Sequence, residues 1–360
     1  MKETITVIGG GNIGTQFACM FAHHGYQVTL YTTNARLFSY ELEICNDMSD
    51  IQYRGKIATI TNHIEEAMKA DIIFITYPAF LFEHLNSLIL PYIHEGVKLV
   101  FVPGTGGVEF IFQNCRKKGA LIYGLQRVPA VARLYEYGKR VCVCGQRKHL
   151  YLGTLGNTSL EEIRQLLCTV FEIDCFCLPN YLCVTMTPSN PILHTSRLAT
   201  MFDQYKDGVY YPDNPLFYGE WSDQSSARLL ACDREHQMLL KSIKGLELSP
   251  VKSLVDHYNK SDTIEKMTQK LRSIPSLHNL HSPMKLCSKG WIPDFGSRYF
   301  QADFPYGLAI IEDIARIAHL DLPNITKTMN WYRNTVDARN LFSLKDYQID
   351  TLLDLIALYL

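Results

Sequence analysis

Neither sign of charge dominates this sequence of 360 residues, which holds 35 Lys and Arg against 36 Asp and Glu. A formal net charge of -1 provides no basic field for a polyanion, so no nucleic-acid partner is expected. Charged residues make up 20% and hydrophobic residues 47%, an ordinary globular composition that excludes a disordered or fibrous chain. The length predicts two domains, because one hydrophobic core seldom serves so many residues.

No apolar run is long enough to cross a bilayer. The longest, from Ile72 to Phe82, is interrupted by Pro78 and falls short of the roughly 20 residues that a spanning helix needs. The chain passes from Met1 almost directly into a strand-like pattern, without the features of a secretory signal. These observations predict a cytoplasmic protein with no membrane partner.

The eleven cysteines lack the spacings of familiar cysteine sites. No C-x-x-C pair occurs, and the closest pairs are Cys142 with Cys144 and Cys175 with Cys177. Zinc ribbons and thioredoxin-type redox pairs need C-x-x-C spacing, so neither is expected and no metal site is predicted. The share of cysteine in the chain is also far below that of disulfide scaffolds. We therefore expect buried, reduced thiols.

The first half of the chain alternates short apolar runs with amphipathic segments. Near-continuous apolar strands separated by helices indicate a parallel sheet that is covered on both faces. The predicted strands are Thr4–Ile8, Gln27–Tyr31, Ile57–Thr61, Asp71–Tyr77, Lys98–Val102, Leu121–Gly124, Arg140–Cys144 and Asp174–Leu178. The predicted helices are Gly14–His24, Ile64–Ala70, Leu81–Ile93, Glu109–Lys118 and Leu160–Val170. The polar stretch before Ile57 is expected to be irregular.

Helical periods replace the strand pattern near residues 181–191, and no β alternation is found beyond them. The predicted helices are Pro191–Gln204, Ala227–Lys244, Val251–Tyr258, Thr263–Ser273, Pro305–Ala318, Ile325–Asp337 and Leu344–Leu358. The fold class is therefore α/β, with a doubly wound domain over residues 1–182 and an all-helical substrate domain over residues 183–360. The cleft between the domains is the expected site. The closing helix is apolar enough for either a homodimer contact or docking on its own core.

A glycine-rich turn follows the first predicted strand. Gly9, Gly11 and Gly14 satisfy the pattern G-x-G-x-x-G between a strand and a helix. The first glycine allows a tight turn, the second lets the backbone approach a pyrophosphate, and the third lets the helix pack closely on the strand. The motif predicts a Rossmann-like domain that binds a dinucleotide. The candidate contacts are Gly9, Gly11, Asn12, Ile13 and Gly14, with Tyr77 and Pro78 at the end of a later strand.

The residues after the second strand bear on the choice of nucleotide. An acidic side chain there typically binds the ribose 2′-hydroxyl of NAD. Here the sequence runs Thr32-Thr33-Asn34-Ala35-Arg36, and the first acid is Glu41. Hydroxyl, amide and guanidinium groups suit a 2′-phosphate. This segment therefore predicts NADP(H) as the preferred cofactor, held by Thr32, Asn34 and Arg36, with NAD(H) as the alternative. The competing explanation is that Arg36 is a solvated surface charge.

Two motifs in the helical half carry candidate chemistry. Asn190 and His194 are four residues apart at a predicted helix start, so they share one face of that helix. Arg298 and Asp303 precede another predicted helix. A guanidinium can hold a carboxylate through two hydrogen bonds, and a carboxylate can hold an imidazole N–H. Each residue also has an ordinary structural explanation, because histidines near helix starts are usually structural and the helix dipole favours an aspartate there.

Together these motifs resemble the opine dehydrogenases, the octopine/nopaline dehydrogenase superfamily, over essentially the whole chain. The resemblance rests on the glycine turn and on two further segments of the first half, Pro103–Gly107 and Pro129–Arg133. It rests most specifically on N-P-x-x-H from Asn190 to His194 and on R-Y-x-x-x-D-x-P-x-G from Arg298 to Gly307.

The resemblance implies an NAD(P)-dependent oxidoreductase that joins the amine of an amino acid to a 2-oxo acid. It implies that His194 is the catalytic acid and base, that Asp303 is its partner, and that Arg298 binds substrate. Asn190 and Pro129 are further candidates for substrate contacts. Ala302 departs from the family pattern, because relatives often carry a second acid at that position.

Two other function classes fit part of the pattern. Reductases similar to 2-dehydropantoate reductase share the fold but place a catalytic lysine early in the second domain, and no lysine lies between Lys148 and Lys206. A non-catalytic NADP-binding sensor would keep the glycine turn without needing the histidine, arginine and aspartate together. NADPH oxidation with mixtures of amino acids and 2-oxo acids distinguishes these classes.

Overall fold

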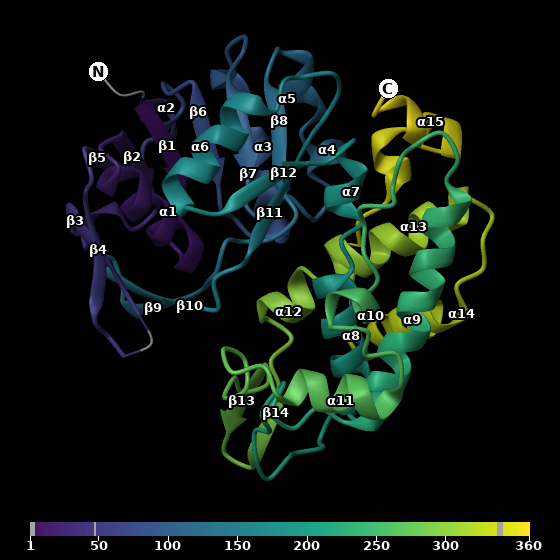
Figure 1. Ribbon diagram of the computed structural model, residues 1–360. Coiled ribbons are helices and arrows are strands. Elements are labelled where there is room, and N and C mark those ends of the chain that lie inside the picture. Colours follow the sequence, from purple (N-terminus) through teal and green to yellow (C-terminus); the bar gives the residue numbers. More distant parts are fainter. Residues whose placement is uncertain (1–3, 47, 337–340) are drawn as a thin grey trace. The chain divides into compact units, whose positions relative to one another are not determined.

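The chain, seen here in a computed structural model, is described over residues 4–46, 48–336 and 341–360 (Figure 1). It divides into two compact units. Unit 1 comprises Met1–Thr185 with Tyr359–Leu360, and unit 2 comprises Met186–Leu358. The division after Thr185 lies three residues beyond the expected boundary at residue 182. The return of the last two residues to unit 1 is a feature that the sequence does not predict.

An eight-stranded sheet forms the centre of unit 1, in the order β12-β11-β8-β7-β6-β1-β2-β5. All neighbouring strands are parallel except β11 and β8. The central order β5-β2-β1-β6-β7-β8 is the doubly wound order of dinucleotide-binding sheets, with its switch point between β1 and β6. The strands are β1 Thr4–Ile8, β2 Gln27–Tyr31, β5 Thr59–Thr61, β6 Ile72–Ile75, β7 Lys98–Phe101, β8 Leu121–Leu125, β11 His149–Thr154 and β12 Asp174–Cys177.

Aromatic packing holds the first helix of unit 1 on this sheet. Phe17 and Phe21 of α1 contact Phe74 of β6 and Phe171 of α6, and all four side chains are buried. Burial of each such side chain stabilises the fold by about 1.5–3 kcal/mol, so α1 is firmly placed. The helices are α1 Asn12–His23, α2 Ile64–Ala67, α3 Phe82–Ile89, α4 Val108–Ile111, α5 Gln113–Lys117, α6 Glu161–Phe171 and α7 Leu182–Thr185.

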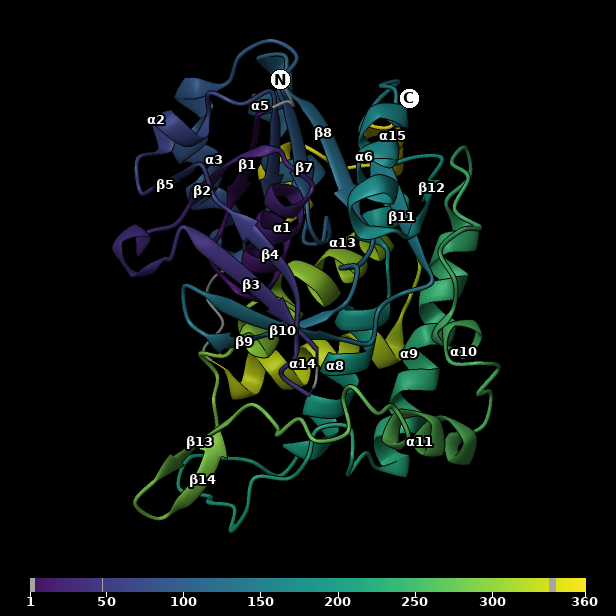
Figure 2. The same cartoon turned by 60° about the vertical axis from the view of Figure 1, so that its left-hand side comes forward.

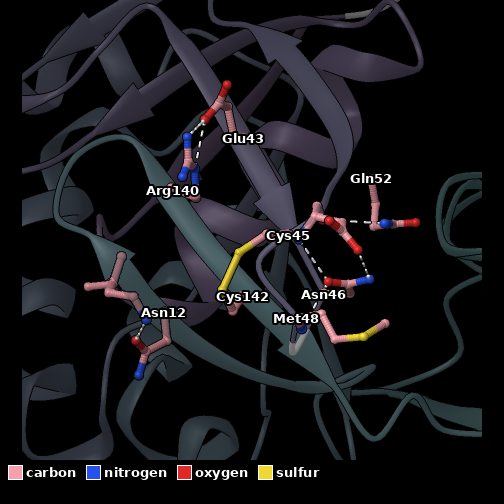
Figure 3. Close-up of a disulfide and its surroundings, with 10 residues drawn as sticks. Asn12, Glu43, Cys45, Asn46, Met48, Gln52, Arg140 and Cys142 are labelled. Atoms are coloured by element: carbon pink, nitrogen blue, oxygen red, sulfur yellow. Dashed lines mark hydrogen bonds and ion pairs between the residues drawn. A yellow bond between two sulfur atoms is a disulfide. The ribbon is translucent and has the colours of Figure 1, made fainter.

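A second sheet, in the order β4-β3-β10-β9, corrects the expectation that the stretch before Ile57 is irregular (Figure 2). Its strands are β3 Glu41–Cys45, β4 Ile51–Lys56, β9 Val131–Glu136 and β10 Arg140–Cys144. Glu43 of β3 is buried and accepts hydrogen bonds from Arg140 of β10 (Figure 3). It also accepts a hydrogen bond from Arg54 of β4, the strand on its other side. Burial opposes ionisation of Glu43, but these hydrogen bonds outweigh it and hold the pKa of this carboxyl below its ordinary value.

One disulfide joins β3 to β10, between Cys45 and Cys142 (Figure 3). The expectation of reduced thiols is therefore wrong for this pair, while the other nine cysteines are thiols. The two residues are 97 positions apart and face each other in the parallel register of β3 and β10. Because the pairing depends on a strand that the sequence pattern hides, no spacing motif reveals it.

Within its described residues, unit 2 is helical apart from one hairpin, so the expectation of an all-helical domain is corrected. The hairpin consists of β13 Met284–Cys287 and β14 Gly290–Pro293. The predicted helix at residues 344–358 is divided by Gln348, which adopts a positive φ of 61°. The predicted helix Ile325–Asp337 ends at a residue that lies outside the described residues. The helices are α8 Ser189–Met201, α9 Asp223–Ser242, α10 Leu254–His257, α11 Ile264–Arg272, α12 Arg298–Gln301, α13 Ala309–Ile317, α14 Pro323–Thr335 and α15 Leu352–Ala357.

A buried carboxyl group holds the end of the chain in unit 1. The hydroxyl of Thr185 lies 2.6 and 2.7 Å from the two carboxylate oxygens of Glu109, and the Tyr359 hydroxyl donates to one of them at 2.9 Å. Glu109 is fully buried, and this burial raises its pKa to about 7. Hydroxyl donors offset only part of the cost of ionising a carboxyl group away from water.

We expect Glu109 to make the stability of the protein pH-dependent. Its pKa rises from an ordinary 4.5 to about 7 on folding, so the folded state binds more protons between these values. The contribution is therefore fully present below pH 4.5 and is lost as the pH rises through about 7. Glu109→Gln removes it, so the melting temperature of the variant relative to wild type should increase from acidic to mildly alkaline pH.

Thermal unfolding by calorimetry across this pH range measures the effect. Glu66→Gln, which changes an exposed glutamate of α2, is the matched control and should show a constant offset from wild type. An equally constant offset for Glu109→Gln would contradict the prediction.

Candidate active site

The glycine turn of unit 1 joins β1 to α1 beside the switch point of the sheet. Gly9 has a φ of 120°, and its N–H donates to the carbonyl of Tyr31 at 2.9 Å. A Cβ atom on Gly14 would lie 1.7 Å from the Gly9 carbonyl oxygen, so only glycine lets α1 begin this close to β1. A Cβ atom on Gly11 would meet nothing within 4 Å, so the space in front of this residue is open.

The start of α1 suits a phosphate group. Gly11 is the N-cap residue and has no side chain to satisfy the first N–H groups of the helix, which lack intrahelical partners. These donors and the positive end of the helix dipole fit the pyrophosphate of a dinucleotide. The side chain of Asn12 has a structural contact, because its Oδ1 accepts from the N–H of Leu134 at 2.8 Å (Figure 3). Ile13 packs against the hydrophobic core.

The segment after β2 carries the residues predicted to select the nucleotide. Thr32 is buried, and its N–H donates to the carbonyl of Thr61 at 3.0 Å. The amide of Asn34 donates to the hydroxyl of Tyr137 at 3.0 Å, across 103 residues. Arg36 is exposed and makes no ion pair within the described residues. Tyr137 is therefore a neighbour of this segment that sequence reasoning did not identify.

Tyr77 and Pro78 follow β6, the strand next to β1. A ring carbon of Tyr77 lies 3.2 Å from the position that a Cβ atom on Gly9 would occupy, so this ring lies beside the glycine turn. Burial raises the pKa of Tyr77 to about 12, which keeps the phenol neutral. Pro129 lies elsewhere in unit 1, in a buried loop after β8 where its carbonyl accepts from the N–H of Arg147 at 2.9 Å.

In unit 2, the two sequence motifs pack directly on one another. His194 lies on α8, and Asp303 immediately precedes a π-helical turn, η4, over Phe304–Leu308. A Cβ atom on Gly307 would lie 3.0 Å from Cγ of Pro191, so a glycine at this position lets η4 approach the first turn of α8. This close approach brings two residues together that are 109 positions apart.

His194 has a hydrogen-bond partner at each ring nitrogen. Its Nδ1 lies 2.7 Å from Oδ2 of Asp303, and its Nε2 lies 3.0 Å from the hydroxyl of Tyr218. Because a carboxylate only accepts hydrogen bonds, Nδ1 carries the proton and the lone pair of the neutral ring lies on Nε2. The rings of Phe217 and Tyr299 lie 5.6 and 4.7 Å from the imidazole centroid. These two hydrogen bonds and two ring contacts together hold the imidazole in one orientation.

Arg298 begins α12, next to the residue whose ring packs on His194. Its guanidinium carbon lies 5.6 Å from the centroid of the Tyr299 ring. The side chain is exposed and makes no ion pair with any carboxylate of the described residues, so it is available to a carboxylate of a substrate. Asn190 is half-buried in the first turn of α8, on the helix that carries His194.

Tyr218 is a further residue of this group, and sequence reasoning did not identify it. It lies in the loop before α9, 24 positions after His194, and no spacing motif connects the two. The loop is visibly rich in tyrosine, but nothing in the pattern selects this residue among 21 tyrosines.

The described part of the chain offers no candidate membrane span and no candidate metal site. None of its helices combines the length and the apolar character needed to cross a membrane. In the same residues, no three His, Cys, Asp or Glu side chains gather in an arrangement that could hold a metal ion.

Comparison with known proteins adds to this geometry. Residues 177–336 match the family model described as NAD/NADP octopine/nopaline dehydrogenase, alpha-helical domain, and residues 5–135 match that of ketopantoate reductase PanE/ApbA. Octopine dehydrogenase of Pecten maximus is 25% identical, over 97% of this chain and 92% of its own. Tauropine dehydrogenase of Arabella iricolor is 26% identical, over 91% and 90%.

A solved structure has the same fold. Octopine dehydrogenase in a complex with NADH and L-arginine superposes with a TM-score of 0.84 at 22% identity, over 99% of this chain and 98% of that one. The prediction of a Rossmann-like α/β domain followed by a helical domain is confirmed. The chain is thus similar to octopine/nopaline dehydrogenases over nearly its whole length.

Proposed function

We propose that this protein is an opine dehydrogenase, which uses NAD(P)H to condense the amine of an amino acid with a 2-oxo acid. The observation that carries the proposal is the buried pair of His194 and Asp303, with Arg298 nearby and without an acidic partner among the described residues. The similarity to octopine and tauropine dehydrogenases and the glycine turn of unit 1 support the same function.

The reaction needs proton transfer at two atoms of the substrates. The amine attacks the carbonyl carbon of the 2-oxo acid, water leaves, and the resulting imine is reduced. The nicotinamide, when bound, supplies a hydride to the imine carbon. Histidine exchanges protons near neutral pH, so His194 takes a proton from the ammonium group and returns one to the departing oxygen.

Asp303 and Arg298 orient the participants. Asp303 accepts from Nδ1 of His194, which fixes the ring and stabilises the imidazolium that forms during proton transfer. Arg298 holds a carboxylate of the 2-oxo acid through its planar guanidinium, and such anchoring raises the effective concentration of the reacting groups. Asn190 and Pro129 are proposed as additional substrate contacts. Ala302 leaves its position without the second acid that relatives often carry.

We propose NADP(H) as the preferred cofactor. The proposal is supported by Arg36, which is exposed and unpaired among the described residues, and by the absence of a carboxylate from Thr32 to Arg36. The open space in front of Gly11 supports binding of the pyrophosphate that both nucleotides share.

The product identifies the reaction. We expect NADPH oxidation only when an amino acid and a 2-oxo acid such as pyruvate are both present. Mass spectrometry should then find a product with the summed mass of both substrates, less one water, plus two hydrogens. Full NADPH oxidation with the 2-oxo acid alone, giving a 2-hydroxy acid, would replace this proposal with a ketoacid reductase.

Cofactor preference depends on the segment after β2. Titration by fluorescence should give a lower Kd for NADPH than for NADH. Arg36→Ala should weaken NADPH binding about tenfold, because a charge-assisted hydrogen bond contributes roughly 1.5–3 kcal/mol, and should leave NADH binding unchanged. Lys117→Ala, which removes an exposed cation from α5, is the control and should change neither affinity. Equal affinities in the wild-type protein would refute the preference.

Gly11→Val, by contrast, should prevent binding of both nucleotides, because its side chain occupies the open space at the start of α1.

The paired residues should behave as a unit in kinetics. His194→Ala should lower kcat by roughly 10²–10⁴, the usual contribution of a general acid and base, with NADPH binding retained. Asp303→Asn should have a similar effect, and the double variant should be little slower than His194→Ala alone. Arg298→Lys should mainly raise KM for the 2-oxo acid. If the two single losses multiply in the double variant, Asp303 acts independently of His194.

A further inference from the structure

Every hydrogen-bonding atom of His194 already has a partner within unit 2. Nδ1 is bound by Asp303, and Nε2 lies 3.0 Å from the Tyr218 hydroxyl. The side chain is 7% exposed, with the Phe217 and Tyr299 rings beside it. An imidazole exchanges protons only at its nitrogen atoms. A proton that leaves Nε2 therefore meets the oxygen of Tyr218 first.

Tyr218 is held in place by buried aromatic neighbours. Its ring is stacked at 24° on that of Trp221, with centroids 6.1 Å apart, and meets the ring of Phe217 edge-on at 5.1 Å. Trp221 is itself completely buried, and its indole N–H donates to the hydroxyl of Ser226 at 3.0 Å. Swinging Tyr218 away from His194 would break this packing, which disfavours displacement of the phenol by a substrate.

We propose that Tyr218 relays protons between His194 and the substrate, a role that rests on the proposed function of His194 as acid and base. In the acid direction, the Nε2–H bond breaks while its proton bonds to the Tyr218 oxygen. The O–H bond of Tyr218 breaks in the same event, and that proton passes to the accepting oxygen or nitrogen of the substrate. The base direction reverses both transfers. Tyr218 is a neutral phenol before and after each transfer.

The chemistry of a phenol suits this role. A hydroxyl donates and accepts at once, so it serves both protonation states of His194 without moving heavy atoms. Burial keeps the pKa of Tyr218 well above its ordinary value, which favours a concerted exchange over formation of a phenolate. The charge of Arg298 acts on the Tyr218 pKa in the opposite direction. The group proposed to anchor the 2-oxo acid is thus within electrostatic reach of the relay.

Tyr218→Phe tests the relay because it removes one hydroxyl and keeps the ring that packs on Trp221. We expect kcat to fall roughly 10²-fold or more, with the Kd of NADPH and the KM of the 2-oxo acid little changed. Tyr332→Phe is the matched control, since it removes a buried hydroxyl that donates to the Phe300 carbonyl in the same unit. The control should keep kcat within a few-fold of wild type. An unchanged or raised kcat for Tyr218→Phe would overturn the relay.

The number of protons that move together in the rate-limiting step distinguishes a relay from a structural role of Tyr218. In single-turnover reactions across mixtures of H₂O and D₂O, the wild-type rate should depend on the deuterium fraction with the curvature of two protons moving together. The residual rate of Tyr218→Phe should depend on it linearly. A linear dependence in the wild-type protein would mean that one proton moves directly between His194 and the substrate, and the relay would be wrong.

A measurement without substrates keeps this proposal distinct from the proposed function. With ¹⁵N-labelled histidine, Tyr218→Phe should shift the Nε2 resonance of His194 downfield and leave that of Nδ1 in place, because only the bond to the lone pair is lost. An unmoved Nε2 resonance would refute the contact on which the relay depends. If no pair of amino acid and 2-oxo acid is turned over by the wild-type protein, the proposed function fails instead, whatever the resonances show.

Discussion

The hydrogen bond between His194 and Asp303 requires two distant segments of unit 2 to approach to within 2.7 Å. Both side chains are buried, and removing one partner would leave the other polar group without compensation, which costs about 1–3 kcal/mol or more. The approach depends on Gly307, because a side chain there would press on Pro191 of α8. This contact gives a steric reason for the glycine in the aspartate motif.

The turn that carries Asp303 is supported from its other side by stacked rings. Phe304 is stacked on Tyr332 of α14 at 4.3 Å and lies nearly parallel to Phe300 of α12 at 6.1 Å. Interlocked aromatic side chains leave little freedom to a π-helical segment, and such segments occur frequently at functional sites. The position of the carboxylate is thereby set by packing, whereas its chemistry is set by the imidazole opposite.

Sequence patterns predict the parts of this protein in which one strong local signal decides the structure. The apolar strands of the main sheet and the glycine turn are of this kind, since Gly14 has to be glycine for steric reasons alone. The second sheet escapes prediction because the inner face of β4, Ile51–Lys56, carries only two apolar side chains, and because β3 buries the charged residue Glu43. The disulfide between Cys45 and Cys142 depends on that sheet, so it escapes prediction as well.

The candidate site likewise contains some residues that the sequence identifies and others that it does not. Asn190 and His194 are assigned to one helix by their spacing, and the motif around Asp303 is local. Tyr218 reaches His194 only through the folded loop before α9, and Tyr137 reaches Asn34 only through the turn between β9 and β10. Neither contact has a periodicity or a spacing that a sequence displays. Residues that act through tertiary contacts of irregular segments are therefore those that sequence reasoning misses.

Two buried acids of this chain show how a partner decides what a carboxylate does. Burial raises the pKa of Glu109 to about 7, because the hydroxyls of Thr185 and Tyr359 carry no charge and offset only part of the cost of ionisation. Asp303 is met by an imidazole, which can itself become positive and so stabilise a carboxylate in the absence of water. The first arrangement fastens a chain terminus, and the second holds the group that we propose exchanges protons with the substrates. Burial is common to both, so it is the ability of the imidazole to take up charge that suits Asp303 to the proposed catalysis.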